Sequence, residues 1–299
     1  MKHVFALTKR NILLFLRDKL SVFFSFMSTI ILVLLYFLFI AKSYTSGILD
    51  QTELPSKDAN FLVYLQMMAG VLILNSMSLT IGVFSTVAKD FETRRIDNFF
   101  TTPVSVSGLL LSYLSAAFIV SFALNVFTWI GSALLIGILT GYFVSFGTVM
   151  MGIVILVFAS VVSCAIMLLV TTLVRSSTAM GVIGGIAGTF FGFLCGIYMP
   201  YSGLGKTTEA VGSCLPYTHL TIWMKQTLLS DAFSKLSLTE EGKDMLMGEF
   251  FSAKNIGFCG FDVSLPVMLV FCGVFALICR ALAWYLLNKR IVKRQTGSK

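Results

Sequence analysis

The chain contains six apolar stretches, each long enough to cross a lipid bilayer as a helix. A bilayer core of about 30 Å needs roughly 20 consecutive apolar residues. The second, third and fourth stretches are longer, so we expect them to tilt, kink or extend beyond the bilayer. The pattern predicts an all-α integral membrane protein whose six transmembrane helices form one domain, residues 1–299. The predicted spans lie near residues 21–40, 61–88, 106–139, 146–174, 179–200 and 264–287.

The composition excludes an ordinary soluble domain. Hydrophobic residues make up 57% of the chain and charged residues only 12%, with a mean hydropathy of +0.91. A soluble domain has roughly 45–50% apolar and about 25% charged residues. We do not expect a cleaved signal peptide, because the basic N-terminal region is long and no A-x-A-like site follows the first apolar stretch.

Basic residues gather on one side of the predicted membrane. The N-terminal segment, the 89–105 connection, the turn after residue 174 and the C-terminal tail hold 14 Lys or Arg and four acidic residues. The opposite side holds seven basic and ten acidic residues. By the positive-inside rule both termini are cytoplasmic, and we expect a multi-pass protein of the plasma membrane. The basic excess also favours contact with anionic lipid rather than with nucleic acid.

The N-terminal arm, residues 1–20, has two interpretations. At helical spacing Arg10 and Arg17 fall near one stripe, whereas Leu13 and Leu16 fall largely on the other side. This pattern favours an amphipathic helix that lies in the membrane interface. The alternative is a positively charged anchor for the first span.

A ridge of glycines marks the fifth predicted span. Gly184, Gly188, Gly192 and Gly196 recur every four residues. Such a ridge allows two helices to approach very closely. Close packing within the chain and self-association between chains both remain open.

The segment between the second and third spans combines charge with exposed aromatics. Two charged turns are followed by Phe99 and Phe100, and Pro103 breaks the chain before the third span. One interpretation is a solvated connector. The other is a short docking helix with the two Phe as anchors.

The polar segment of residues 201–263 lies on the extracytoplasmic side. Apolar stretches between its Pro breaks favour short re-entrant or interfacial helices. Cys214 and Cys259 both lie on this oxidising side, so they form either a disulfide or two free thiols.

The residue inventory argues against an enzyme. The chain has two His, and the predicted spans contain no Asp or Glu and a single full charge, Arg280. Paired acids, a nucleophile with its base, metal ligands and the midplane ionisable groups of proton-coupled transporters are therefore missing. We expect Arg280 either to snorkel toward the inner headgroups or to pair with another helix. Uphill transport would need energy from another subunit.

Three local signals resemble the permease subunits of type-2 ATP-binding cassette (ABC) exporters. They are the arm before the first span, the charged run 89–95 followed by Thr102-Pro103-Val104-Ser105, and the outer pattern Gly196…Pro200 with Leu215-Pro216-Tyr217-Thr218-His219. The chain departs from the family at Thr93-Arg94-Arg95-Ile96-Asp97, where a G-T-L-E-like run is common, and in its longer outer loop.

The resemblance implies a permease that exports an amphipathic drug, peptide or lipid-like cargo. Two separate ATPase subunits would carry ATP and Mg²⁺, with no cofactor on this chain, and a second permease copy or a similar permease would complete the pathway. Pro200, Pro216 and His219 would form the extracytoplasmic gate. A passive channel or a membrane sensor or scaffold is the alternative. The residues that would couple to the ATPase are Arg10, Arg17, Asp90, Glu92, Arg94, Arg95, Phe99, Phe100 and Pro103.

Overall fold

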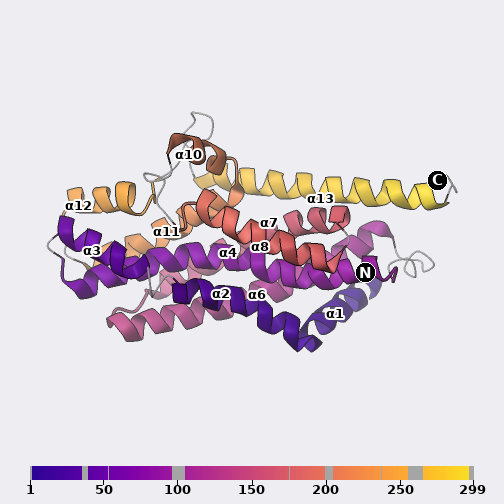
Figure 1. Ribbon diagram of the computed structural model, residues 1–299, viewed down its shortest axis with the longest axis horizontal. Coiled ribbons are helices and arrows are strands. Elements are labelled where there is room, and N and C mark those ends of the chain that lie inside the picture. The colour runs from indigo at the N-terminus through magenta and orange to yellow at the C-terminus, as the bar shows by residue number, and fades with distance from the viewer. Residues whose placement is uncertain are drawn as a thin grey trace.

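All regular elements in the described part of the chain are helical (Figure 1). The computed structural model describes residues 2–35, 40–52, 54–95, 105–174, 176–198, 205–236, 238–254 and 265–295. The long helices lie roughly along one axis. The elements are α1 (Lys2–Arg17), α2 (Lys19–Leu35), α3 (Ala41–Gln51), α4 (Ser56–Glu92), α6 (Val106–Thr140), α7 (Phe146–Val174), α8 (Ser177–Leu194), α10 (Lys206–Ser213), α11 (Pro216–Lys235), α12 (Glu240–Met245), the π-helical η2 (Leu246–Phe250) and α13 (Leu265–Gln295).

Five helices among the described residues are long and apolar enough to cross a membrane. They are α4, α6, α7, α8 and the Pro266–Lys289 part of α13. The predicted span 146–174 coincides with α7, and 106–139 ends one residue before α6 does. The first predicted span, 21–40, is helical from residue 21 to the end of α2 at Leu35 and then enters residues 36–39, which lie outside the described part. This first predicted span, which would bring the number of transmembrane helices to six, therefore stays a prediction.

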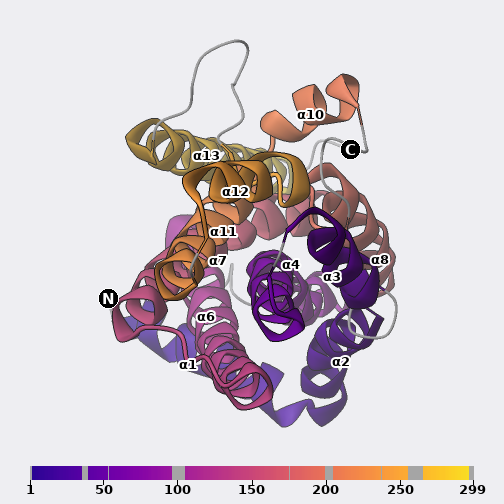
Figure 2. The ribbon, with the colours of Figure 1, turned by 90° about the vertical axis from the view of Figure 1, so that its left-hand side faces the viewer.

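Helix α4 lies at the centre of the bundle, surrounded by the other long helices (Figure 2). Of its most apolar 18 residues 89% are buried, against 11% for α8. Its 37 residues would measure about 56 Å at 1.5 Å per residue, well beyond the bilayer core. A helix that is apolar on all sides is buried in a protein core or in lipid, and α4 is buried among other helices.

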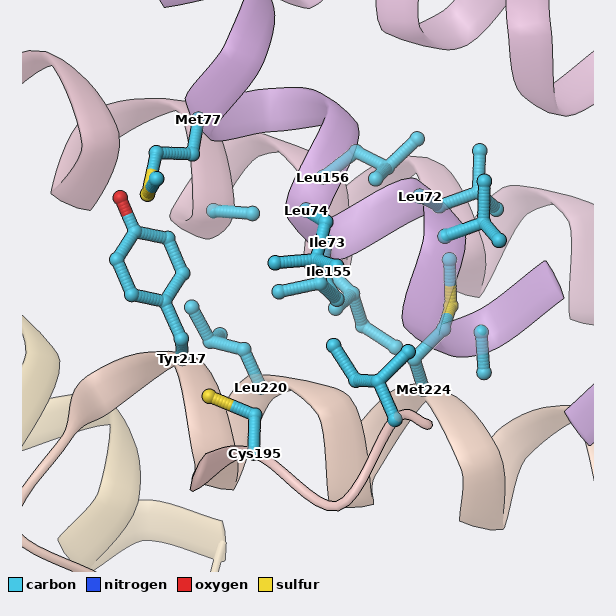
Figure 3. Close-up of a cluster of buried hydrophobic side chains, with 14 of the residues drawn as sticks. Leu72, Ile73, Leu74, Met77, Ile155, Leu156, Cys195, Tyr217, Leu220 and Met224 are labelled. Carbon is cyan, nitrogen blue, oxygen red and sulfur yellow. The ribbon is translucent and has the colours of Figure 1, made fainter. Parts of the chain in front are cut away.

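The core around α4 joins three helices in one apolar cluster (Figure 3). Ile73 of α4, Leu156 of α7 and Leu220 of α11 are all fully buried there. Burying such a side chain is worth about 1.5–3 kcal/mol in water-soluble proteins. Inside a bilayer, close packing has to take over from the exclusion of water.

Polar contacts also join α4 to α6 inside the bundle. Asn75 donates to Asn125 Oδ1 at 3.0 Å, and Asn125 donates to Ser76 Oγ at 2.5 Å. All three side chains are buried. Hydrogen bonds of this kind hold transmembrane helices together because lipid offers the groups no alternative partner.

The fifth predicted span ends earlier than the sequence indicated. Helix α8 stops at Leu194, not near Pro200, because Gly196 takes a left-handed backbone with φ +62°. The N–H groups of Ile197 and Tyr198 then bind back to the carbonyl of Gly192 at 3.0 and 3.1 Å. Glycine takes this conformation without the strain that a Cβ introduces, so it commonly follows a helix end. Gly196 is therefore not part of the helical ridge.

Candidate functional site

A bidentate ion pair joins the N-terminal helix α1 to the end of α4. Arg10 of α1 donates to both carboxylate oxygens of Asp90, at 2.9 and 3.2 Å. The Asp90 side chain is 5% exposed and that of Arg10 is 32% exposed. Tyr113 of α6 is buried next to the pair. Bidentate pairing fixes orientation as well as distance, so α1, α4 and α6 meet at one defined point.

A second contact joins α4 to α8 on the same face. One carboxylate oxygen of Glu92 accepts from the backbone N–H of Ser177 at 3.2 Å and from its hydroxyl at 2.8 Å. Ser176, in the N-cap position of α8, makes no side-chain capping bond in the described structure. A carboxylate beside the first N–H groups of a helix is favourable because these groups carry partial positive charge. Glu92 thus caps α8 from another helix.

Asp18 shapes the turn from α1 into α2. Its carboxylate accepts from the Ser21 N–H at 3.1 Å and from the Ser21 hydroxyl at 2.8 Å. These bonds, the backbone one first, hold the pKa of Asp18 below its usual value. The turn sets the angle at which the arm meets α2.

The residues predicted to couple to an ATPase differ in how exposed their side chains are. Arg17, Glu92, Arg94 and Arg95 are exposed, and Arg94 has a positive φ of 55° just after the α4 helix. Asp90, in contrast, is buried and engaged by Arg10. The predicted coupling residues Phe99, Phe100 and Pro103 lie outside the described residues, so their role stays a prediction.

In the segment predicted to be extracytoplasmic, α11 packs inside the bundle against α4 and α7. Pro216 occupies its first turn, where a missing N–H costs nothing. The Tyr217 hydroxyl donates to Ser163 Oγ of α7 at 3.0 Å, in a buried contact. His219 is buried, with Nε2 2.7 Å from the Ser213 carbonyl and its ring edge-on to Phe271. Pro216 and His219, the two predicted gate residues that the structure describes, thus position the α10–α11 corner, and their role in a gate stays a prediction.

Lys225 of α11 joins two separate segments. Its ammonium donates to the carbonyl oxygens of Gly196 and Phe251, each at 2.8 Å, and the side chain is 1% exposed. Sequence reasoning counted Lys225 only as an outer-side charge. A lysine within the apolar run from Leu220 to Leu229 was the signal that could have singled it out.

The glycine face of α8 is only partly covered by its own chain. A Cβ at Gly184 would approach Ile81 of α4 to 3.2 Å, and one at Gly192 would collide with the Tyr198 ring. Gly188 has no other described atom within 4 Å of such a Cβ, and neither do Gly181 and Gly185. Exposed Val182, Ile186 and Phe190 accompany them. Gly184 and Gly192 therefore serve close packing within the chain, whereas the surface at Gly181, Gly185 and Gly188 is not covered by another element.

The structure describes only some of the residues in three further predictions, which concern Arg280, the disulfide and the gate. Arg280 is exposed on α13, the state that snorkelling requires. Cys214 is exposed, but Cys259 and Pro200 lie outside the described residues, so the disulfide and the full gate stay predictions.

A family model described as ABC-2 type transporter matches residues 2–229, which is more than half of the chain. The chain belongs to the ABC-2 type transporter family. A comparison with curated proteins finds no match. The matched range runs from α1 into α11, so it includes the Arg10–Asp90 pair, the Glu92 cap and Lys225.

As an ABC-2 type transporter chain, this protein is a multi-pass membrane transport component. The family generally works with ABC ATPase subunits. The resemblance noted from the arm, the 89–105 connection and the outer Pro-Tyr-Thr-His pattern is thereby confirmed.

Proposed function

We propose that the chain is the permease subunit of an ATP-driven exporter that moves an amphipathic drug, peptide or lipid-like molecule out of the cytoplasm. Two separate ATPase subunits would bind ATP and Mg²⁺ and drive the cycle. The observation that carries the proposal is the buried Arg10–Asp90 pair, because it builds a firm cytoplasmic face in a chain of the ABC-2 type transporter family.

This face offers a partner both rigidity and charge. Asp90 does not reach a partner directly, because Arg10 covers it, so we assign it the role of fixing the arm. Exposed Arg17, Arg94 and Arg95 surround the fixed point and can register against acidic groups of an ATPase. Phe99 and Phe100 would supply the apolar anchors of the same interface.

The surface of the helices supports the proposed cargo class. Large apolar side chains are exposed along α6, α8 and α13, for example Phe127, Phe190 and Leu277. In the described spans fixed charges are scarce, and Arg280 lies on the exposed face of α13. A strongly charged hydrophilic cargo would find few counter-charges there, whereas an amphipathic one would be accepted.

We assign the bare part of the α8 ridge to a second permease copy. Gly181, Gly185 and Gly188 would let the backbone of a neighbouring helix approach closely. The arm would lie in the inner interface of the plasma membrane, because Phe5, Leu13 and Leu16 are exposed on α1 while Phe15 packs inward. Figure 1 shows both termini at one end of the bundle, as cytoplasmic termini require.

The test is reconstitution of the chain with a co-purifying P-loop ATPase in proteoliposomes. A fluorescent amphipathic dye should cross the membrane only when hydrolysable ATP is supplied. It should be released on the side opposite to the ATPase. Dye movement that proceeds down its gradient without ATP would identify a passive channel instead. Failure of any ATPase to co-purify would contradict the proposed partnership.

A further inference from the structure

The two ends of α8 are each held by a polar side chain from a different helix. At its first residue, Ser177, the backbone and hydroxyl donate to Glu92 at the end of α4. Two residues after its last, the Gly196 carbonyl accepts from Lys225 of α11. These contacts join elements 85 and 29 residues apart in the chain.

The outer attachment is the firmer of the two. Lys225 is buried, and its second hydrogen bond to Phe251 brings the segment after η2 to the same point. Ile197, next to Gly196, packs against Gly70 of α4 so closely that a Cβ at Gly70 would collide with it. The end of α8 is therefore fastened to α11 and to the outer segment.

Between the two attachments α8 packs against α4, whereas a Cβ built at Gly181, Gly185 or Gly188 would meet no atom of another element within 4 Å. The helix is 18 residues long, about 27 Å at 1.5 Å per residue. A packed helix moves as a rigid element rather than bending continuously, so a shift at one end reaches the other. Helix α10, which contacts both α8 and α11, carries the exposed Cys214 immediately after it.

We propose that α8 transmits movement from the cytoplasmic end of α4 to the extracytoplasmic segment, with Glu92 as the positioning residue at its inner end and Lys225 as the fastening at its outer end. The inference rests on the proposed function, because an ATPase supplies the movement. It assigns Glu92 to a contact within this chain rather than to the ATPase interface.

The experiment uses the reconstituted complex with its ATPase, in a Cys259→Ser background. The rate at which a membrane-impermeant maleimide labels Cys214 from outside is measured with and without ATP. We expect ATP to change that rate severalfold in the parent. In Glu92→Ala we expect the ATPase to remain associated. We expect the ATP-dependent change in labelling rate to fall below 1.5-fold, which corresponds to about 0.2 kcal/mol and is roughly the scatter of such a rate measurement.

A double variant separates transmission from simple helix capping. Ser176→Asp supplies α8 with its own N-cap carboxylate but not with a link to α4. We expect Glu92→Ala combined with Ser176→Asp to remain unresponsive, and Glu241→Ala, at an exposed acid on α12, to respond like the parent.

Four results would overturn the inference. They are a parent rate that ignores ATP, an ATP response that survives in Glu92→Ala, recovery in the double variant, and loss of ATPase association in Glu92→Ala. Absence of ATPase binding by the parent would instead remove the proposed function, and the inference with it.

Discussion

Single side chains at the end of the bundle that holds the termini act mainly on other parts of the same chain. Asp90 is buried against Arg10, and Glu92 two residues later caps α8. Both carboxylates come from the last turns of α4, yet they point to different helices. One short acidic segment therefore holds three helices in place.

The Arg10–Asp90 pair should contribute to stability as well as to docking. Asp90→Asn removes the charge from the carboxylate that the Arg10 guanidinium binds, and we expect a loss of about 1–3 kcal/mol in the free energy of unfolding. The full penalty of a buried pair does not apply, because Arg10 retains some contact with solvent. Thermal unfolding of the detergent-solubilised chain measures it.

Two variants control this measurement. Asp50→Asn, at an exposed acid of α3, should leave the unfolding temperature unchanged. Arg10→Gln combined with Asp90→Asn should lose less than the sum of the two single losses. Additive losses would show that the pair is not a unit.

Lys225 gives a second prediction at the residue scale. Lys225→Met leaves the carbonyls of Gly196 and Phe251 without their buried donor. Each unpaired buried acceptor costs about 1–3 kcal/mol, so this variant should unfold at a clearly lower temperature than the parent. Lys254→Met, at a 57% exposed lysine, is the matched control. Equal behaviour of the two variants would refute the buried fastening.

Among the elements, α8 differs from its neighbours in how its surface is used. Within the chain it packs against α4 through Gly184 and against its own return segment through Gly192. At Gly181, Gly185 and Gly188 a Cβ would meet no atom of another element within 4 Å, so another helix has room to approach there. The ridge thus contains two kinds of position that share one sequence pattern.

Substitutions should separate these positions. Gly192→Ala places a methyl group into the Tyr198 ring, so we expect loss of folded protein. Gly188→Leu meets open space, so the chain should fold normally but assemble less with a second copy. Light scattering of the purified protein reports assembly, and circular dichroism reports folding. A Gly188→Leu chain that assembles like the parent would place the second copy elsewhere.

On the scale of the whole molecule, the long helices order the chain between two polar ends. The C-terminal end of α4 and the turn between α1 and α2 lie at the end with the termini, while the N-terminal end of α4 and the end of α11 lie at the other (Figure 1). Beyond the termini's end of the bundle, Asp58 accepts from the Tyr142 hydroxyl at 3.0 Å, and Asp231 pairs with Lys235 at 2.6 Å.

Accessibility labelling tests which end faces the cytoplasm. Ser234→Cys, exposed near the end of α11, should react with an impermeant maleimide in intact cells. Thr93→Cys, exposed after α4, should react only after permeabilisation. Variants of otherwise cysteine-free chains keep the background low. The reverse pattern would invert the orientation and contradict export in the proposed direction.

The sequence by itself determined the helical class, the approximate positions of five long apolar helices and the family. These follow from runs of apolar residues and from motifs in order along the chain, which are local properties that a bilayer makes decisive. Even the bounds of α7 could be predicted, because polar or turn-forming residues flank its apolar run.

Only the tertiary structure decided which residues meet. Arg10 and Asp90 are 80 positions apart, and nothing local distinguishes this pairing from contact with an ATPase. The burial of Lys225 likewise depends on α11 packing between α4 and α7, and the early end of α8 on bonds that return to Gly192. Contacts between distant segments are selected by packing geometry, and an apolar pattern alone does not encode that geometry.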